Sequence, residues 1–149
     1  MPALIFHAES KGFIRIEKNA LEKLKKSFSG ALIESGGMIG SDNGVIVDFC
    51  FDNGGDPEKY VPNVEKLNKK IAEWQKSGIS FAGIVHSHHN DCRLLSDADI
   101  NYAHTILKSC GMASVCFPIV TYRGEEIIVT PYIIGSKTVE KADFLVIDD

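Results

Sequence analysis

Two histidines two positions apart, His86 and His88, end a long apolar stretch and are the first residues whose spacing suggests chemistry. This stretch, residues 79–88, is typical of a buried central strand whose last turn emerges at an edge of the sheet. Side chains two apart on a strand point the same way, so both imidazoles could bind one metal ion. A polar loop then leads to Ser96 and Asp99, where a helix begins, and Asp99 could add a carboxylate.

Two histidines and one carboxylate, with a fourth position left to water, are the ligand set of a catalytic zinc site, whereas structural zinc normally has four Cys or His ligands. The sequence therefore predicts that His86, His88 and Asp99 bind zinc (Zn2+). Zinc lowers the pKa of bound water to about 7, and a carboxylate outside the ligand set can take its proton. Glu34 is our candidate for this general base, because it follows an apolar run beside Gly36, where a charge has no obvious packing role.

Simpler interpretations exist for some of these residues. Ser96 and Asp99 have the S-x-x-D spacing of a capping box, which explains both without a metal. The two roles are compatible, because a helix cap would also hold a hydroxyl and a carboxylate in place near a metal. Cys92 lies between the predicted ligands and could be a thiolate ligand or a nucleophile, but His86, His88 and Asp99 already account for the ligand set.

The sequence predicts both strands and helices, and these elements must position the candidate residues. We expect strands at residues 13–17, 32–39, 45–51, 79–88, 113–121 and 126–133, with an edge strand at 143–149. We expect helices from a capping box at Asn19 and Glu22, from Val64 through Leu67, Ile71 and Trp74 to Gly78, and from Ser96 through Ile100, Ala103 and Leu107. Turns at residues 41–44 and 123–124 join hairpins. This order predicts an α+β fold with a mixed, largely antiparallel sheet flanked by helices.

Length and composition limit the class of protein. A chain of 149 residues with 44% hydrophobic residues suits one globular domain, so we expect a single domain over residues 1–149. The net charge of −4 supplies no basic field for nucleic acid, which we do not expect as a partner. The sequence shows neither a membrane-spanning apolar run nor a signal peptide at its start, so we expect a cytoplasmic protein. The four cysteines form no C-x-x-C pair, and we expect reduced thiols.

The arrangement of Glu34, the His86-x-His88 pair, seven residues, Ser96, two residues and Asp99 resembles the JAMM signature of the JAB/MPN/Mov34 metalloprotease family. Residues 34–40 are similar to the family's Glu-x-x-Gly strand, and the element order matches from about residue 12 to residue 134. The resemblance implies the MPN/JAB fold, a cytidine-deaminase-like arrangement of the sheet and helices. It also suggests a compact member of the prokaryotic type.

The same resemblance implies a function. Such a protein would be a zinc-dependent isopeptidase or peptidase that cleaves at the C-terminus of ubiquitin or a ubiquitin-like modifier. Its zinc ligands would be His86, His88 and Asp99. Glu34 would hold and deprotonate the water at zinc and then pass the proton to the leaving amine, and Ser96 would hydrogen-bond the tetrahedral oxyanion.

The chain departs from the family pattern at two places. His89 follows the second histidine where many members have proline, a difference that bears on modifier specificity. Residues 52–77 fall where the family often has an insertion that contacts the modifier, whereas Gly111 leads directly into a strand and leaves little room for a second insertion.

Other functions remain open. The main alternative is a non-catalytic MPN-type scaffold that binds protein partners, although such domains generally lose one or more ligands. The RadC-like branch, which is associated with DNA repair, shares the His, Ser and Asp spacing, but the sequence after His88 and the acidic net charge argue against it. Peptidases that trim small modifiers in sulfur-transfer pathways are a variant of the first function.

Overall fold

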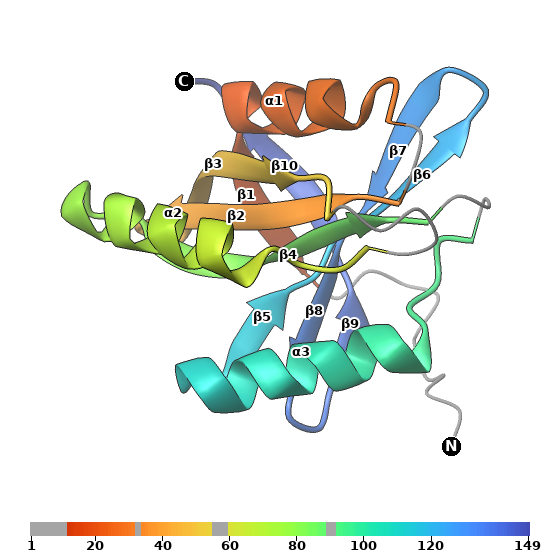
Figure 1. Ribbon diagram of the computed structural model, residues 1–149. Helices are drawn as coiled ribbons and strands as arrows, with labels where there is room; N and C mark the ends of the chain where they lie inside the picture. Colours follow the sequence, from red (N-terminus) through yellow and green to blue (C-terminus); the bar gives the residue numbers. More distant parts are fainter. Residues whose placement is uncertain (1–11, 32–33, 55–59, 89–91) are drawn as a thin grey trace.

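The computed structural model describes residues 12–31, 34–54, 60–88 and 92–149 (Figure 1). His89 and the first residues of the strand predicted at 32–39 lie outside these residues. In chain order the elements are β1 (Phe13–Glu17), α1 (Lys18–Phe28), β2 (Gly36–Asp42), β3 (Val45–Asp52), α2 (Val64–Lys76), β4 (Ser80–Ser87), α3 (Asp97–Cys110), β5 (Ser114–Cys116), β6 (Ile119–Arg123), β7 (Glu126–Thr130), β8 (Tyr132–Gly135), β9 (Val139–Lys141) and β10 (Asp143–Ile147).

The strands of the described residues form one mixed sheet in the order β10-β1-β3-β2-β4-β5-β8-β9, and β6 pairs with β4 and β7. Five of the nine strand pairings are antiparallel and four are parallel. Strand β4 is central, because it pairs with β2 on one side and with β5 and β6 on the other. The predicted α+β class and the burial of this strand are therefore confirmed.

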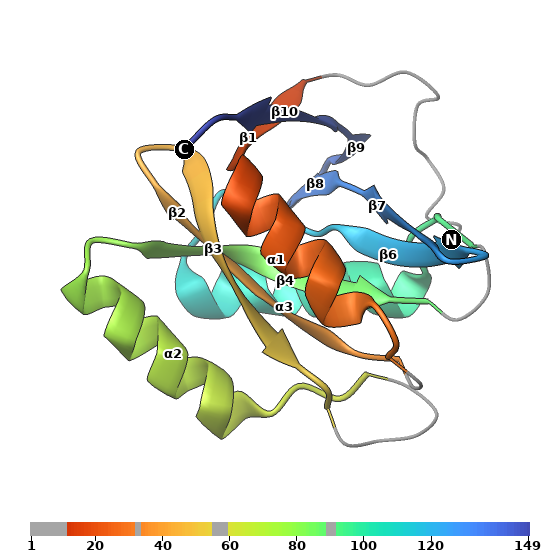
Figure 2. The same cartoon turned by 90° about the horizontal axis from the view of Figure 1, so that it is seen from above.

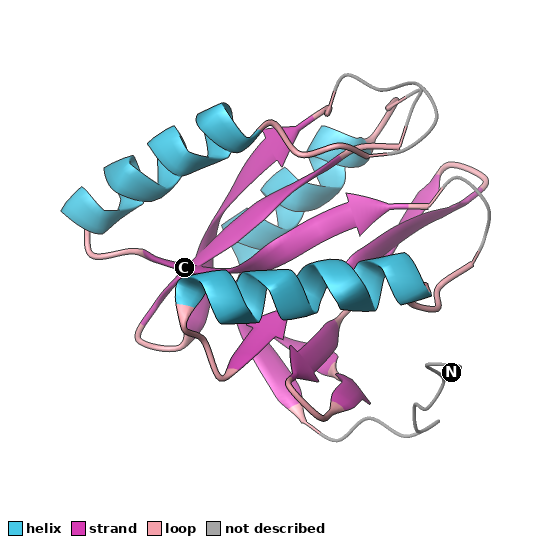
Figure 3. Cartoon of the chain, turned by 60° about the horizontal axis from the view of Figure 1, so that its bottom comes forward, coloured by secondary structure: helices cyan, strands magenta, loops and turns pink. Residues whose placement is uncertain are grey.

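Helices cover both faces of the sheet (Figure 3). Each face has its own core of buried residues. Helix α1 crosses one face, as Figure 2 shows from above, and buries Leu24 and Phe28 against Phe49 of β3. Helices α2 and α3 contribute Trp74 and Ile106 to the core on the opposite face. None of the helices in the described ranges is long and apolar enough to span a membrane.

Local sequence signals explain two of the connections. The β2–β3 hairpin turns at Asn43 and Gly44, which have φ angles of 51° and 79°. Two consecutive residues with positive φ are the requirement of a type I′ turn, which Asn-Gly meets best. Helix α2 begins where the Asn63 side chain accepts a hydrogen bond from the Lys66 N–H at 3.1 Å. The predicted hairpin and this amphipathic helix are confirmed.

The strands predicted at residues 113–121 and 126–133 are each divided in two. Pro118 separates β5 from β6, and Pro131 separates β7 from β8. Proline lacks the N–H that a continuous strand would donate, so the ladder is interrupted at both places. As a result β5 pairs with β8 whereas β6 pairs with β7. The short strand β9 follows β8 and was not predicted from the sequence.

The capping box predicted at Asn19 and Glu22 is wrong. Helix α1 begins at Lys18, directly after β1, and Glu17 takes the N-cap position without a side-chain hydrogen bond. The Asn19 N–H instead bonds to Asp149 Oδ1 at 3.3 Å. The predicted capping box would have paired the Asn19 N–H with the Glu22 side chain. In the structure a tertiary contact satisfies this N–H instead.

Candidate metal centre

The two histidines lie at the C-terminal end of the central strand β4. His86 is in the strand and His88 follows its last residue, so both side chains point to the face that α2 and α3 cover. Their backbones are held by β6 and the residue before it: the His86 N–H donates to the Pro118 carbonyl at 3.2 Å, and the His88 N–H donates to the Val120 carbonyl at 2.9 Å.

Asp99 reaches the histidines from the first turn of α3. The capping box predicted there is present: the Ser96 N–H donates to Asp99 Oδ2 at 2.8 Å, and the Asp99 N–H donates to Ser96 Oγ at 3.1 Å. The cap therefore fixes a buried carboxylate whose other oxygen, Oδ1, faces His86. Capping and metal binding are compatible here, because Oδ1 takes no part in the cap, while Oδ2 accepts from the Ser96 N–H and also lies near His88.

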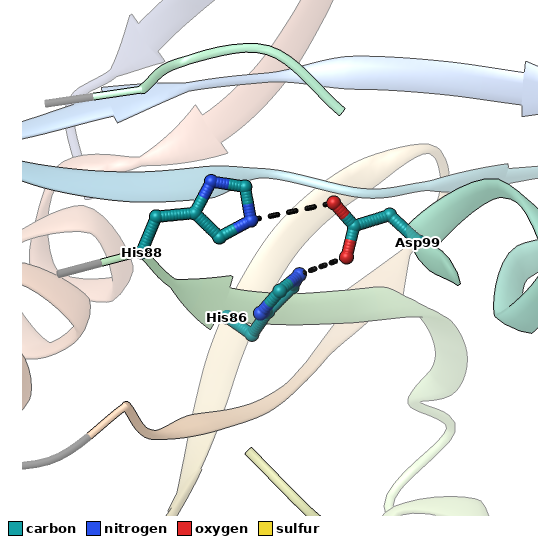
Figure 4. A group of neighbouring side chains, drawn as sticks. All are labelled: His86, His88 and Asp99. Carbon is teal, nitrogen blue, oxygen red and sulfur yellow. Dashed lines mark hydrogen bonds and ion pairs between the residues drawn. The ribbon is translucent and has the colours of Figure 1, made fainter. Parts of the chain in front are cut away.

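The three side chains converge on a small space (Figure 4). The distance between His86 Nε2 and Asp99 Oδ1 is 2.5 Å, and that between His88 Nε2 and Asp99 Oδ2 is 3.3 Å. One ligand atom of each residue lies within 4.8 Å of the other two. His86, His88 and Asp99 could therefore hold a metal ion.

The charges of this group are set by its own contacts. Burial opposes ionisation of Asp99, but hydrogen bonds from His86 and His88 and from the Ser96 N–H hold the pKa of its carboxyl well below the usual range. Burial also opposes a charged His88, yet the bonds to Asp99 and to the Cys92 carbonyl raise the pKa of this imidazole overall. The carboxylate is thus paired with an imidazole that holds its proton more firmly than a free one.

The donor set and its spacing fit a zinc ion after a small movement. Ligand atoms at about 2.0–2.2 Å from a tetrahedral zinc lie roughly 3.3–3.6 Å apart. The pair formed by His88 and Asp99 already has this spacing, at 3.3 Å. The 2.5 Å contact between His86 and Asp99 has the length of a direct hydrogen bond and would have to open by roughly 1 Å.

One cavity of about 400 Å3 brings all five predicted site residues together. Its lining consists of Glu34, His86, His88, Ser96 and Asp99 together with Tyr60, Val61, Pro62, Ile84, Ala98 and Tyr102. The carboxylate of Glu34 is close enough to contribute to the raised pKa of His88. The segment after Glu34 is held beside β4, because the Ser87 N–H donates to the Ser35 carbonyl at 2.8 Å and the Ser35 N–H donates to Ser87 Oγ at 3.0 Å.

The sequence analysis missed the residue that packs against His86. The ring of Tyr60 stacks on this imidazole, with centroids 6.2 Å apart and planes inclined by 24°. The Tyr60 hydroxyl donates to Asp52 Oδ2 at 2.9 Å, and the buried Asp52 carboxylate also accepts from the N–H groups of Gly54 and Asn63. A tyrosine in a polar, glycine-rich loop was the available signal, but the sequence alone does not tell which element that loop covers.

Two further residues whose side chains can bind metals, His104 and Cys92, are not part of the ligand group found among the described residues. His104 is exposed on α3, as a surface histidine would be. Cys92 is exposed, and the ligand group found among the described residues does not include its thiol. Its contribution is the backbone carbonyl, which accepts a hydrogen bond from His88 Nδ1 at 2.9 Å.

Comparisons with known proteins identify the fold. No protein-family model matches the chain, and no curated protein matches it in sequence. Among solved structures, protein DSY2949 from Desulfitobacterium hafniense superposes with a TM-score of 0.69 at 17% identity, covering 92% of this chain and 94% of that one. AF2198, a JAB1/MPN domain protein from Archaeoglobus fulgidus, superposes with a TM-score of 0.56 at 16% identity, covering 91% and 98%. The chain therefore has an MPN-like fold.

Proposed function

We propose that the chain is a zinc-dependent isopeptidase or peptidase of the JAMM type that cleaves at the C-terminus of ubiquitin or a ubiquitin-like modifier. One observation carries the proposal: residues from three separate segments, Glu34, His86 with His88, and Ser96 with Asp99, line a single cavity. The MPN-like fold supports the proposal. The residues whose spacing resembles the JAMM signature also lie at this cavity.

In this proposal His86, His88 and Asp99 hold the metal. Zinc, when bound, would supply a Lewis acid that activates a water molecule and polarises the scissile carbonyl. The contact of His88 Nδ1 with the Cys92 carbonyl leaves Nε2 as the nitrogen that faces Asp99, because a carbonyl oxygen can only accept a hydrogen bond. The protein thus presents this ring in the tautomer that metal binding requires.

Glu34 and Ser96 carry the proton transfer and the charge stabilisation. The Glu34 carboxylate, at the cavity wall near His88, would accept the proton of the attacking water and pass it to the leaving amine. Ser96 Oγ accepts its one hydrogen bond within the described residues from the Asp99 N–H, so its own proton can be donated to the developing oxyanion.

The remaining walls of the cavity suit an extended, narrow peptide. Tyr60, Val61, Pro62 and Tyr102 supply an apolar lining beside the polar residues. A modifier tail that ends in Gly-Gly would fit, because glycine lets a backbone approach closely. We place the protein in the cytoplasm in this proposal.

A non-catalytic MPN-type scaffold is the second candidate, and one observation favours it. The Asp99 carboxylate already bonds to both imidazoles and to the helix cap, so the residues are satisfied without a metal. Zinc binding separates the two candidates, because a scaffold has no need of it.

Replacing Glu34 with Gln tests the catalytic role. The amide cannot accept a proton, so hydrolysis of a modifier carrying a C-terminal extension should fall about 10²–10⁴-fold while zinc content stays unchanged. Glu126→Gln, an exposed carboxylate on β7, is the matched control and should keep full activity. Undiminished turnover in Glu34→Gln would reject the general-base assignment.

A further inference from the structure

We infer that Tyr132 is a positioning residue of the metal centre, which it serves by anchoring the segment that orients His88. The inference rests on the proposed function in that His88 is taken as a metal ligand. Tyr132 lies in β8 and does not line the cavity. It acts through the backbone of Arg93 and Cys92, one step removed from the ligand.

His88 needs support of its own because β4 ends one residue before it. Its ring is oriented by the hydrogen bond from Nδ1 to the Cys92 carbonyl, at 2.9 Å. The imidazole can turn only as far as this carbonyl allows, so the position of Cys92 decides where Nε2 points. Groups that orient ligands in this way have a large effect on metal affinity.

The segment that contains Cys92 has no strand or helix to hold it before α3 begins at Asp97. Tyr132 supplies an anchor: its hydroxyl donates to the Arg93 carbonyl at 2.6 Å. The tyrosine is 2% exposed and is packed in the core between the sheet and α3, as is Leu95 of the anchored segment. A short bond from a rigid core residue therefore fixes the peptide next to the one that bonds His88.

A tyrosine that served packing alone would behave differently from a positioning residue. Its ring would fill the core in both roles, but only positioning requires the hydroxyl. Burial raises the pKa of Tyr132 to about 12, so the hydroxyl keeps the proton that it donates. Tyr132→Phe removes the hydroxyl and leaves the ring, which separates the two roles.

Tyr122→Phe is the matched control. Its hydroxyl also donates to a backbone carbonyl, that of Phe28, at 3.1 Å. Tyr122 belongs to the core on the α1 side of the sheet, and its other hydroxyl neighbour, Ser87, points away from His86 and His88 because side chains alternate along β4. Both variants remove a tyrosine hydroxyl that donates to a backbone carbonyl, but Tyr122 is on the side of the sheet without the candidate metal centre.

The experiment measures the zinc affinity of the wild type and both variants by competition with a chelator, together with the melting temperature of each zinc-free protein. Tyr132→Phe should bind zinc about 10- to 100-fold more weakly, whereas Tyr122→Phe should stay within about threefold of the wild type. The zinc-free melting temperatures of the two variants should fall by similar amounts, about 2–8 °C. The visible spectrum of bound cobalt(II) should change in Tyr132→Phe and not in Tyr122→Phe.

Equal zinc affinities and cobalt spectra in all three proteins would overturn the inference while leaving the proposed function intact. A wild type that binds no zinc would overturn both. Leu95→Ala keeps the test decisive if Tyr132→Phe does not fold, because it loosens the same segment without touching the tyrosine. This variant should also weaken zinc binding, and unchanged affinity in it would count against the anchoring role.

Discussion

The two faces of the sheet use the same strands for different purposes. The α1 face is closed by aromatic packing: Phe28 contacts Phe49 and Phe51 with ring centroids 5.8 and 5.4 Å apart. On the opposite face the core continues as far as Phe117, whose ring is nearly perpendicular to that of His86 with centroids 5.5 Å apart, and the cavity begins there. The α1 face is thus packed with apolar side chains, whereas the opposite face includes the polar residues that line the cavity.

Strand β4 shows the division most clearly because it belongs to both faces. Val85 is fully buried towards α1, and its neighbour His86 points into the cavity on the other side. A strand with period-two alternation can therefore supply packing on one side and ligands on the other. The comparison indicates that stability and metal binding can be changed separately.

The largest expected effect that would test this separation comes from Phe49→Ala on the α1 side. Removing a fully buried phenylalanine should lower the free energy of unfolding by about 3–5 kcal/mol, measured by urea denaturation of the zinc-free protein. The zinc affinity of the folded variant should equal that of the wild type. A parallel loss of zinc affinity would show that the two faces are not independent.

A second, smaller effect follows from pH, because the face with the candidate metal centre has paired titratable groups near its core. His88 has a raised pKa in the folded protein, so its contribution to stability is complete below its unfolded value of about 6.5 and is lost as the pH rises through the folded value. Asp99 has a lowered pKa and stays ionised throughout this range. The zinc-free protein should therefore lose stability as the pH rises through the His88 transition.

Zinc affinity should change in the opposite direction over the same range. Zinc must displace the His88 proton, so affinity should fall by up to about tenfold per pH unit below the folded pKa of His88. Melting temperatures of the zinc-free protein and chelator competition, both taken between about pH 5.5 and 8.5, measure the two trends. An affinity that does not depend on pH in this range would contradict the participation of His88.

Much of the centre could be predicted because its signals are local. A His-x-His pair ending an apolar strand, and a serine three residues before an aspartate, fix side-chain directions by the geometry of one strand and one helix end. Glu34 could be proposed only from its unusual surroundings in the sequence. Its place at the cavity depends on the pairing of β2 with β4, which the sequence does not specify.

The features that were missed depend on long-range contacts. Pro118 and Pro131 indicated interruptions, but the new pairing of β5 with β8 depends on how the chain crosses the sheet. The stacking of Tyr60 on His86 and the anchoring of Arg93 by Tyr132 join segments that are far apart in the sequence. The hydrophobic periodicity of a single helix or strand does not predict such contacts.

The central claim is that His86, His88 and Asp99 form a zinc site, and zinc per chain in the wild type and in Asp99→Ala tests it most directly. Elemental analysis of tag-free protein should find about one zinc per wild-type chain and a clear loss in the variant, with the fold retained. Absence of zinc from the wild type, even after incubation with the metal, would contradict the claim. It would leave Ser96 and Asp99 as a helix cap and favour the scaffold.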